Sequence, residues 1–262
     1  MKPAAAPSGQ MDKTQLRDSY DILAPMWDAA RSHMLEGVMP YIMTNLPARK
    51  GRALDIGCGS GQVLRRLSPE FEEVRGIDLS PKMLEAARQV TAGYSNVRFQ
   101  EMDAEALAFE EETFDFVSGI AVLHHIDPFK GVSEAARVLR PGGRLLFMGP
   151  SRGGAAKSMS PTERGESVSH APRRWARLRR IGLENLRLAR ALGLRNLLLW
   201  KRFWTHQVQA NTRFLTHDQW LALAATLPGS QVGHYRYYVT MLWDKPGQET
   251  VDFPRLQVQR KP

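Results

Sequence analysis

Cysteine is nearly absent from this sequence: Cys58 is the single one among 262 residues, so no intramolecular disulfide bond can stabilise the fold. Long apolar runs are absent too, because no stretch reaches the 18 residues from which a transmembrane helix is predicted. The N-terminal MKPAAAPSGQMDK holds no apolar segment of signal-peptide length, and its Pro, Ser and Gly predict a loose tail over residues 1–13. We therefore expect a soluble, cytoplasmic protein.

Metal-binding patterns are also missing. The sequence has no HExxH, no CxxC and no cluster of His and Asp at ligand spacing, so we predict no bound metal. The composition is otherwise that of a globular protein, with 43% hydrophobic and 24% charged residues. Positive charge is unevenly distributed, because residues 173–204 hold ten Lys and Arg but one acid, Glu184, and the rest of the chain is balanced.

Apolar runs and amphipathic stretches alternate over residues 51–149. The runs are RALDIG, EVRGIDL, VRFQEMD, FDFVSGIAV and GRLLFMG, and helical segments such as SPKMLEAARQV lie between them. This alternation predicts parallel strands joined by helical crossovers. Leu16, Tyr20, Leu23 and Trp27 recur at helical spacing and predict a helix over residues 14–46.

The rest of the chain divides by composition. We expect a core over residues 14–150, a basic helical insert over 151–215, a completing helix and strands over 216–246, and a tail over 247–262. THDQWLALAATL predicts a helix capped by Thr216. QVGHYRYYVTMLWDKP predicts a last strand with a shortened predecessor, because no Asn-Gly or similar turn interrupts it.

A glycine loop, LDIGCGSG, follows the first predicted strand and opens the first crossover helix. Gly57, Gly59 and Gly61 allow a sharp turn and a close approach of a ligand to the backbone. Their GxGxG spacing differs from the GxGxxG of dinucleotide-binding loops. Taken alone, the loop is equally well explained as a tight strand-to-helix turn.

Three acids stand where predicted strands end. Asp55 could meet an ammonium group, Asp78 could accept both hydroxyls of a ribose, and Asp103 could reach an adenine amino group. A helix cap is the alternative interpretation for both Asp78 and Asp103. Because parallel strands end at one edge of a sheet, the three acids are expected near the glycine loop.

The segments ALDIGCGSG, GIDLSPKML, QEMDAEALAF, FDFVSGIAVLHHI and EAARVLRPGGRLLF occur in this order with matching spacing. Together they resemble the class I S-adenosylmethionine-dependent methyltransferases, especially the group that contains ubiquinone-, menaquinone- and biotin-pathway enzymes. The resemblance covers residues 15–150 well and 214–245 loosely. It implies an α/β, Rossmann-like fold with a mostly parallel seven-stranded sheet, an antiparallel last strand and a helical lid insert.

The resemblance also implies roles for residues at matching positions. Asp55, Gly57, Gly59 and Gly61 would hold the methionine end of S-adenosylmethionine, and Asp78 would bind its ribose hydroxyls. The adenine would lie among Leu79, Met102, Asp103 and Ala104, while Gly119 and Ile120 would line the channel near the sulfonium. Cys58 is interpreted as a small loop residue, because methyl transfer needs no thiol.

Candidate catalytic and acceptor-binding residues flank the expected cofactor site. His124 and His125 follow the fourth predicted strand and could act as a general base, or could be structural. Tyr20 and Trp27 could bind the acceptor or belong to the core. GIAVLHHI stands where many methyltransferases of bases and proteins have Asn/Asp-Pro-Pro-aromatic, which favours a small, hydrophobic or lipid-like acceptor.

The basic segment 173–204 allows three interpretations. It could be a lid over the acceptor site, an element that contacts an anionic membrane surface, or an RNA-binding patch. Gly182 and Gly193 are predicted to split it into shorter helices. No RNA-binding module is visible in the sequence, so nucleic acid is the least favoured partner. The alternative to a methyltransferase is an RNA-binding or noncatalytic cofactor-binding protein with the same fold.

Overall fold

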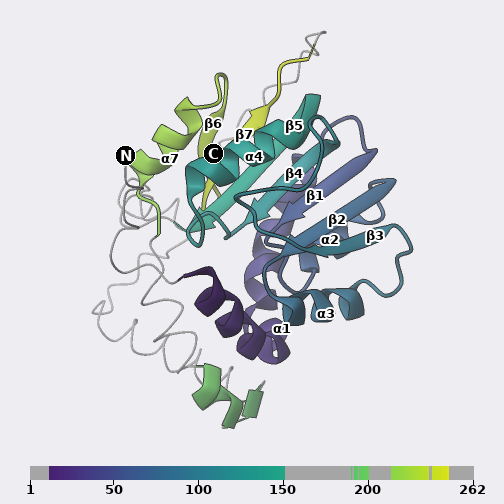
Figure 1. Cartoon of the computed structure of the whole chain (residues 1–262), viewed down its shortest axis with the longest axis vertical. Coiled ribbons are helices and arrows are strands. Elements are labelled where there is room, and N and C mark those ends of the chain that lie inside the picture. The colour runs from purple at the N-terminus through teal and green to yellow at the C-terminus, as the bar shows by residue number, and fades with distance from the viewer. Residues whose placement is uncertain are drawn as a thin grey trace, which may run out of the picture.

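Seven strands form one sheet in the order β3-β2-β1-β4-β5-β7-β6 (Figure 1). This computed structural model describes residues 12–150, 190, 192–193, 195–200, 214–235 and 238–247. The elements are α1 (Lys13–Thr44), β1 (Arg52–Ile56), α2 (Gln62–Leu67), β2 (Glu73–Asp78), α3 (Pro81–Val90), β3 (Val97–Glu101), β4 (Phe114–Ile120), α4 (Pro128–Val138), β5 (Leu139–Pro150), α7 (His217–Ala225), β6 (Gln231–Tyr235) and β7 (Tyr238–Asp244).

The strand directions match the predicted topology. β1, β2, β3, β4 and β5 pair in parallel, and β7 runs antiparallel to both β5 and β6. The chain moves outward from β1 through β2 to β3 and then returns to place β4 on the other side of β1. This reversal makes a topological switch point beyond the carboxyl ends of β1 and β4, where open α/β sheets bind their ligands.

The last two strands pair antiparallel along the whole of β6. Their pairing runs from Gln231 opposite Leu242 to Tyr235 opposite Tyr238. β6 is the shorter strand, with five residues against seven in β7, as the sequence predicted. The absence of a turn signature did not prevent the pairing, because cross-strand contacts and the packing of Tyr235 on Tyr41 fix the register.

Helices cover both faces of the sheet, with α4 and α7 on one face and α2 and α3 on the other (Figure 1). Successive residues of β5 alternate between the two cores: Leu145 and Phe147 pack on the α4 face, and Leu146 and Met148 on the α2 face. Each such side chain is fully buried and contributes roughly 2 kcal/mol to folding.

Helix α1 is long and contains two prolines, Pro25 and Pro40. Asp12 caps it by accepting a hydrogen bond from the backbone N–H of Gln15. Its later half packs on the sheet through Val38 and Ile42, while its first half extends past the carboxyl ends of the strands. The first half therefore covers the switch point.

The described part of the basic segment, residues 190, 192–193 and 195–200, is helical. Leu197 and Trp200 are buried there, and Trp200 packs on Leu23 and Met26 of α1. Gly193 has a φ of 74°, but this residue and the described residues on both sides of it are helical, so the split at this glycine stays a prediction. The remaining insert, including Gly182, and the tails 1–11 and 248–262 lie outside the described residues.

Candidate active site

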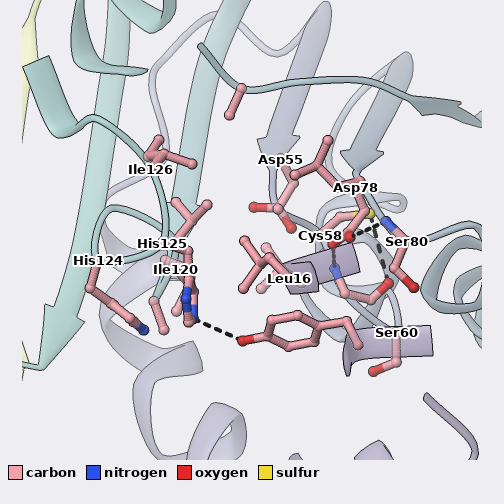
Figure 2. Close-up of a pocket in the computed structure, with 18 of the residues that line it drawn as sticks. Leu16, Asp55, Cys58, Ser60, Asp78, Ser80, Ile120, His124, His125 and Ile126 are labelled. Atoms are coloured by element: carbon pink, nitrogen blue, oxygen red, sulfur yellow. Dashed lines mark hydrogen bonds between the residues drawn. The ribbon is translucent and has the colours of Figure 1, made fainter. Parts of the chain in front are cut away.

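A cavity of about 260 Å³ lies at the switch point, between the carboxyl ends of the central strands and the first half of α1 (Figure 2). Most of the residues predicted to form a site line it. They are Tyr20, Trp27, Asp55, Gly57, Gly59, Asp78, Leu79, Met102, Ala104, Ile120, His124 and His125. Three predicted residues, Gly61, Asp103 and Gly119, are not part of its lining.

The glycine loop has the backbone that its sequence requires. Gly57, Gly59 and Gly61 have φ values of 66°, 52° and 82°, which L-residues rarely adopt. A Cβ on Gly57 would lie 2.7 Å from Val122, and one on Gly61 would lie 2.9 Å from the Cβ of Ala87. Gly57 and Gly59 thus open the loop to the cavity, whereas Gly61 allows α2 to pack closely on α3.

Asp78 joins the glycine loop to the loop after β2. Its two carboxylate oxygens accept hydrogen bonds from the backbone N–H groups of Gly59 and Ser80, both at 2.9 Å. The cap of α3 is Ser80, whose hydroxyl accepts from the N–H of Met83, so the helix-cap interpretation of Asp78 is wrong. Removal from water raises the pKa of Asp78, although the two backbone N–H groups oppose that shift.

Asp55 is the more deeply buried acid, with 2% of its surface exposed. Its one described hydrogen bond comes from the hydroxyl of Ser118 at 2.7 Å. Burial, with a smaller contribution from the negative charge of Asp78, raises the pKa of Asp55 to about 7. Among the described residues, neither Asp55 nor Asp78 forms an ion pair. A buried carboxylate without a cationic partner is costly to ionise, which agrees with the raised pKa of Asp55.

Asp103 points toward α1 rather than into the cavity. One carboxylate oxygen lies 2.5 Å from Nζ of Lys13, and the other accepts from the N–H of Glu105 at 2.9 Å. Its neighbours Met102 and Ala104 do line the cavity. The loop after β3 thus contributes an apolar wall, and its acid ties the start of α1 to that loop.

Gly119 and Ala121 show two different constraints at the end of β4. A Cβ on Gly119 would overlap the ring of Phe147, so this glycine is explained by packing inside the sheet. Ala121 lines the cavity with a φ of 58° and donates its N–H to the carbonyl of Met148 at 2.6 Å. No sequence pattern marked Ala121, because an alanine in a left-handed conformation has no residue signature.

His125 lies across the cavity from the two acids (Figure 2). Its Nε2 is 2.8 Å from the hydroxyl of Tyr20. Burial lowers the pKa of His125 to about 4, so the ring is neutral at physiological pH. The ring of His124 lies 4.1 Å from that of His125 and 5.0 Å from Phe214, which completes this wall.

An aromatic row continues from this wall to the basic segment. Tyr20 lies 5.3 Å from Trp27, and Trp27 lies 5.9 Å from Trp200. Trp27 lines the cavity, while Trp200 is buried against α1 outside it. The described part of the basic segment therefore reaches the site through Trp27.

Several lining residues had no signal strong enough to single them out. They are Leu16, Arg17, Leu35, Cys58, Ser60, Val63, Ser80, Ala121, Val122, Ile126, Pro150, Phe214 and Tyr238. Leu16 shares a helix face with Tyr20 and Trp27, so that spacing could have identified it. Burial raises the pKa of the Cys58 thiol well above its usual range, which agrees with its interpretation as a small, unreactive residue.

Fold and site together define a Rossmann-like protein with a ligand-sized cavity at the switch point of its sheet. Residues 54–147 match the family model described as a methyltransferase domain. Over these residues the chain contains a methyltransferase domain, which is similar to the class I S-adenosylmethionine-dependent methyltransferases, and S-adenosylmethionine is the cofactor of that family. Among the described residues, no group of three His, Cys, Asp or Glu is placed to hold a metal ion.

Known proteins similar to this chain include two bacterial methyltransferases. The chain is 40% identical over 100 residues to an uncharacterized methyltransferase of Bacillus subtilis, covering 37% of this chain and 40% of that protein. It is 28% identical over 149 residues to a ubiquinone biosynthesis O-methyltransferase of Coxiella burnetii, covering 54% and 64% of the two chains. The matches thus span less than two thirds of each relative.

A solved structure shows the same fold. It is that of a SAM-dependent methyltransferase, possible histamine N-methyltransferase, from Thermotoga maritima. The two superpose with a TM-score of 0.55 over 87% of this chain and 99% of the other, at 18% sequence identity.

No helix in the described part of this chain is both long and apolar enough to cross a bilayer.

Proposed function

We propose that this protein transfers a methyl group from S-adenosylmethionine to a small, hydrophobic or lipid-like acceptor. The observation that carries the proposal is the pair of acids at the cavity, the buried Asp55 and the partly buried Asp78, neither of which has a described cationic partner. S-adenosylmethionine carries an ammonium group, which could pair with Asp55, and ribose hydroxyls, which could donate hydrogen bonds to Asp78. The methyltransferase domain and the ubiquinone-pathway relative support the same conclusion.

The site residues fit the parts of that cofactor. Asp55 would face the ammonium group, the glycine loop would hold the methionine end, and Asp78 would accept the ribose hydroxyls on its remaining lone pairs. Leu79, Met102 and Ala104 offer apolar surface for the adenine. When bound, the cofactor supplies a methyl group already activated by a sulfonium, so the protein must mainly align the acceptor with it.

His125 is better suited to positioning than to proton abstraction. A base whose pKa is about 4 has little tendency to accept a proton near pH 7. In its neutral form His125 can accept a hydrogen bond from Tyr20, which fixes the tyrosine ring at the cavity wall. His124 lines the same wall and is the histidine closer to Phe214. We assign the pair, with Tyr20 and Trp27, to acceptor placement.

The apolar part of the cavity lining favours an apolar acceptor. Trp27, Leu35, Phe214 and Tyr238 present carbon surface there. Arg17 is the one Lys or Arg in the described lining, and it already pairs with Asp18 at 3.0 Å. A polyanionic acceptor would therefore find little charge compensation in the described lining, whereas an aromatic or lipid-like molecule could exchange water for apolar contact there.

Calorimetry and a turnover assay test this function. S-adenosylmethionine should bind the wild-type protein, and Asp78→Ala should abolish the binding without unfolding the chain. Catechols and other quinone precursors should then yield S-adenosylhomocysteine at a rate above the acceptor-free background. Unchanged affinity in Asp78→Ala would contradict the site, and binding without turnover across the panel would favour the noncatalytic alternative.

We further propose that the basic segment brings the site to an anionic membrane surface on the cytoplasmic side. Arg190 and Arg195 are exposed, and Leu198 is 65% exposed, so this part of the segment presents basic and apolar groups together. Each basic residue near an anionic bilayer contributes about 1 kcal/mol of attraction. A surface-bound enzyme could take a greasy acceptor without releasing it into water.

Flotation with liposomes tests this contact. The protein should float with phosphatidylglycerol vesicles at low salt and less at high salt, and Leu198→Glu should weaken flotation. Leu221→Glu is the matched control, because Leu221 is an exposed leucine on α7, outside the segment. Equal flotation of both variants, or none by the wild type, would contradict membrane contact. Salt-sensitive binding to RNA alone would instead support the nucleic-acid interpretation.

A further inference from the structure

Two acids of α1 contact the loops that form the cofactor site. Oδ1 of Asp28 lies 2.5 Å from the hydroxyl of Ser60. Oδ1 of Asp21 lies 2.5 Å from the hydroxyl of Ser80 and accepts a second hydrogen bond from the N–H of Lys82 at 3.2 Å. The two acids are seven residues apart, which places them on the same side of the helix about two turns from each other.

The two serines occupy special positions. Ser60 lies within the glycine loop, and Ser80 caps α3 two residues after Asp78. Asp78 already joins these two loops through the N–H groups of Gly59 and Ser80. Each loop is therefore held by Asp78 at the end of β2 and by direct contact with an acid of α1.

The same stretch of α1 forms a wall of the cavity. Leu16, Tyr20 and Trp27 line it, and Nε1 of Trp27 comes within 3.8 Å of the position of a Cβ on Gly59. If α1 moved away from the two loops, this wall and the Tyr20–His125 hydrogen bond would move with it. The contacts of Asp21 and Asp28 thus link the cofactor loops to the acceptor wall.

We propose that Asp21 and Asp28 are positioning residues that hold α1 over the bound cofactor and so control how long it stays in the site. We call the pairs Asp21–Ser80 and Asp28–Ser60 the α1 latch. The inference rests on the proposed function, because it takes S-adenosylmethionine or its product as the occupant. Hydrogen bonds to a carboxylate are stronger than neutral ones, so two of them suffice to bias a helix between closed and open positions.

The latch also predicts a link between the two substrates. A cofactor bound to Asp78 and the glycine loop would keep Ser60 and Ser80 facing α1. Closed α1 would in turn present Tyr20 and Trp27 to the acceptor. Because such coupling is reciprocal, a bound acceptor that favours closed α1 should slow cofactor release.

Stopped-flow displacement of S-adenosylhomocysteine, followed by tryptophan fluorescence, measures the latch directly. Asp21→Ala with Asp28→Ala should raise the dissociation rate by about tenfold or more, as expected for losing two charged hydrogen bonds. The KM for S-adenosylmethionine should rise more than kcat falls. Glu36→Ala, which removes an exposed acid from the same helix, should change the dissociation rate by less than about twofold.

A double-mutant cycle distinguishes the loss of the Asp28–Ser60 contact from a general disturbance of the structure. Asp28→Ala and Ser60→Ala should each speed dissociation, and the double variant should be no faster than the single ones, because both remove the same contact. Asp28→Asn, which keeps an acceptor oxygen, should restore part of the slow release. Ser60→Ala provides the test if the Asp28 variant fails to fold, as judged by circular dichroism.

The outcomes separate the latch from the proposed function. If the wild-type protein binds neither S-adenosylmethionine nor S-adenosylhomocysteine, the proposed function fails. If it binds them and the folded latch variants release the product at the wild-type rate, the latch is wrong while the function stands. Additive effects of Asp28→Ala and Ser60→Ala would likewise overturn it.

Discussion

Tyr20 and His125, which are 105 residues apart in sequence, meet at 2.8 Å across the cavity. One belongs to α1, and the other follows β4. The contact joins α1, which covers the site, to the segment after the carboxyl end of β4, where the sulfonium of a bound cofactor is expected. Removing it should therefore affect the placement of the acceptor more than the binding of the cofactor.

Tyr20→Phe tests that separation. The variant keeps the ring and loses the hydroxyl, so we expect the acceptor KM to rise about 5- to 10-fold, the cost of one buried hydrogen bond. The dissociation constant of S-adenosylmethionine should stay within about twofold. Tyr94→Phe, which alters a tyrosine that is 38% exposed, is the control. A variant that loses cofactor affinity but keeps its acceptor KM would refute the assignment.

Cofactor binding should release a proton near neutral pH. The pKa of Asp55 is raised to about 7 in the absence of a ligand, so the group is about half protonated at pH 7. A cation beside it lowers that pKa, and affinity should then fall as pH drops below 7. Calorimetry of S-adenosylmethionine binding in phosphate and in Tris should reveal release of about half a proton at pH 7. Asp55→Asn should bind without this buffer dependence.

Asp55 and His125 should oppose each other in the pH dependence of stability. The folded-state pKa of His125, about 4, is below its unfolded value of 6.5, so the unfolded chain alone takes up this proton and stability falls as pH drops from 6.5 to 4. The folded-state pKa of Asp55, about 7, is above its unfolded value of 3.8, so stability falls as pH rises from 4 to 7. The two slopes largely cancel between pH 4 and 6.5.

Asp55→Asn should reveal the contribution of His125 to the pH dependence of stability. At pH 8 the variant lacks a buried charge, and its free energy of unfolding should exceed that of the wild type by up to about 3 kcal/mol. Below pH 6.5 it should lose stability more steeply than the wild type, because the His125 contribution is no longer opposed. Urea denaturation at pH 5, 6.5 and 8 measures both effects. Parallel pH profiles for the two proteins would contradict this account.

Local patterns predicted much of the fold and one side of the site. Short apolar runs identified the strands, and parallel strands place their ends at one edge, so Asp55, Asp78 and the glycine loop could be expected together. The continuous apolar run of β5 and the helical spacing in α1 likewise follow from the sequence. These features depend on neighbours in sequence or on a general rule of topology.

What could not be predicted depends on contacts between distant segments. The orientation of Asp103 toward Lys13 and the pairing of Asp28 with Ser60 require knowing how α1 lies on the strand edge. No periodicity encodes that placement, since it results from the packing of the whole helix. Gly119 is a further example. Its position next to Ile120 suggested a place in the cofactor site, whereas the structure shows that a larger residue there would overlap the ring of Phe147.

Gly119→Ala should therefore reduce stability rather than cofactor affinity. The added methyl group would overlap the ring of Phe147, and overpacking of this kind costs roughly 1–3 kcal/mol. Gly93→Ala is the matched control, since a Cβ on Gly93 meets nothing within 4 Å. Urea denaturation should show the loss for Gly119→Ala alone, and calorimetry on its folded fraction should give the wild-type affinity for S-adenosylmethionine. A stable Gly119→Ala variant with weakened cofactor binding would contradict this explanation. It would indicate instead that Gly119 borders the cofactor and that the added methyl group obstructs the ligand.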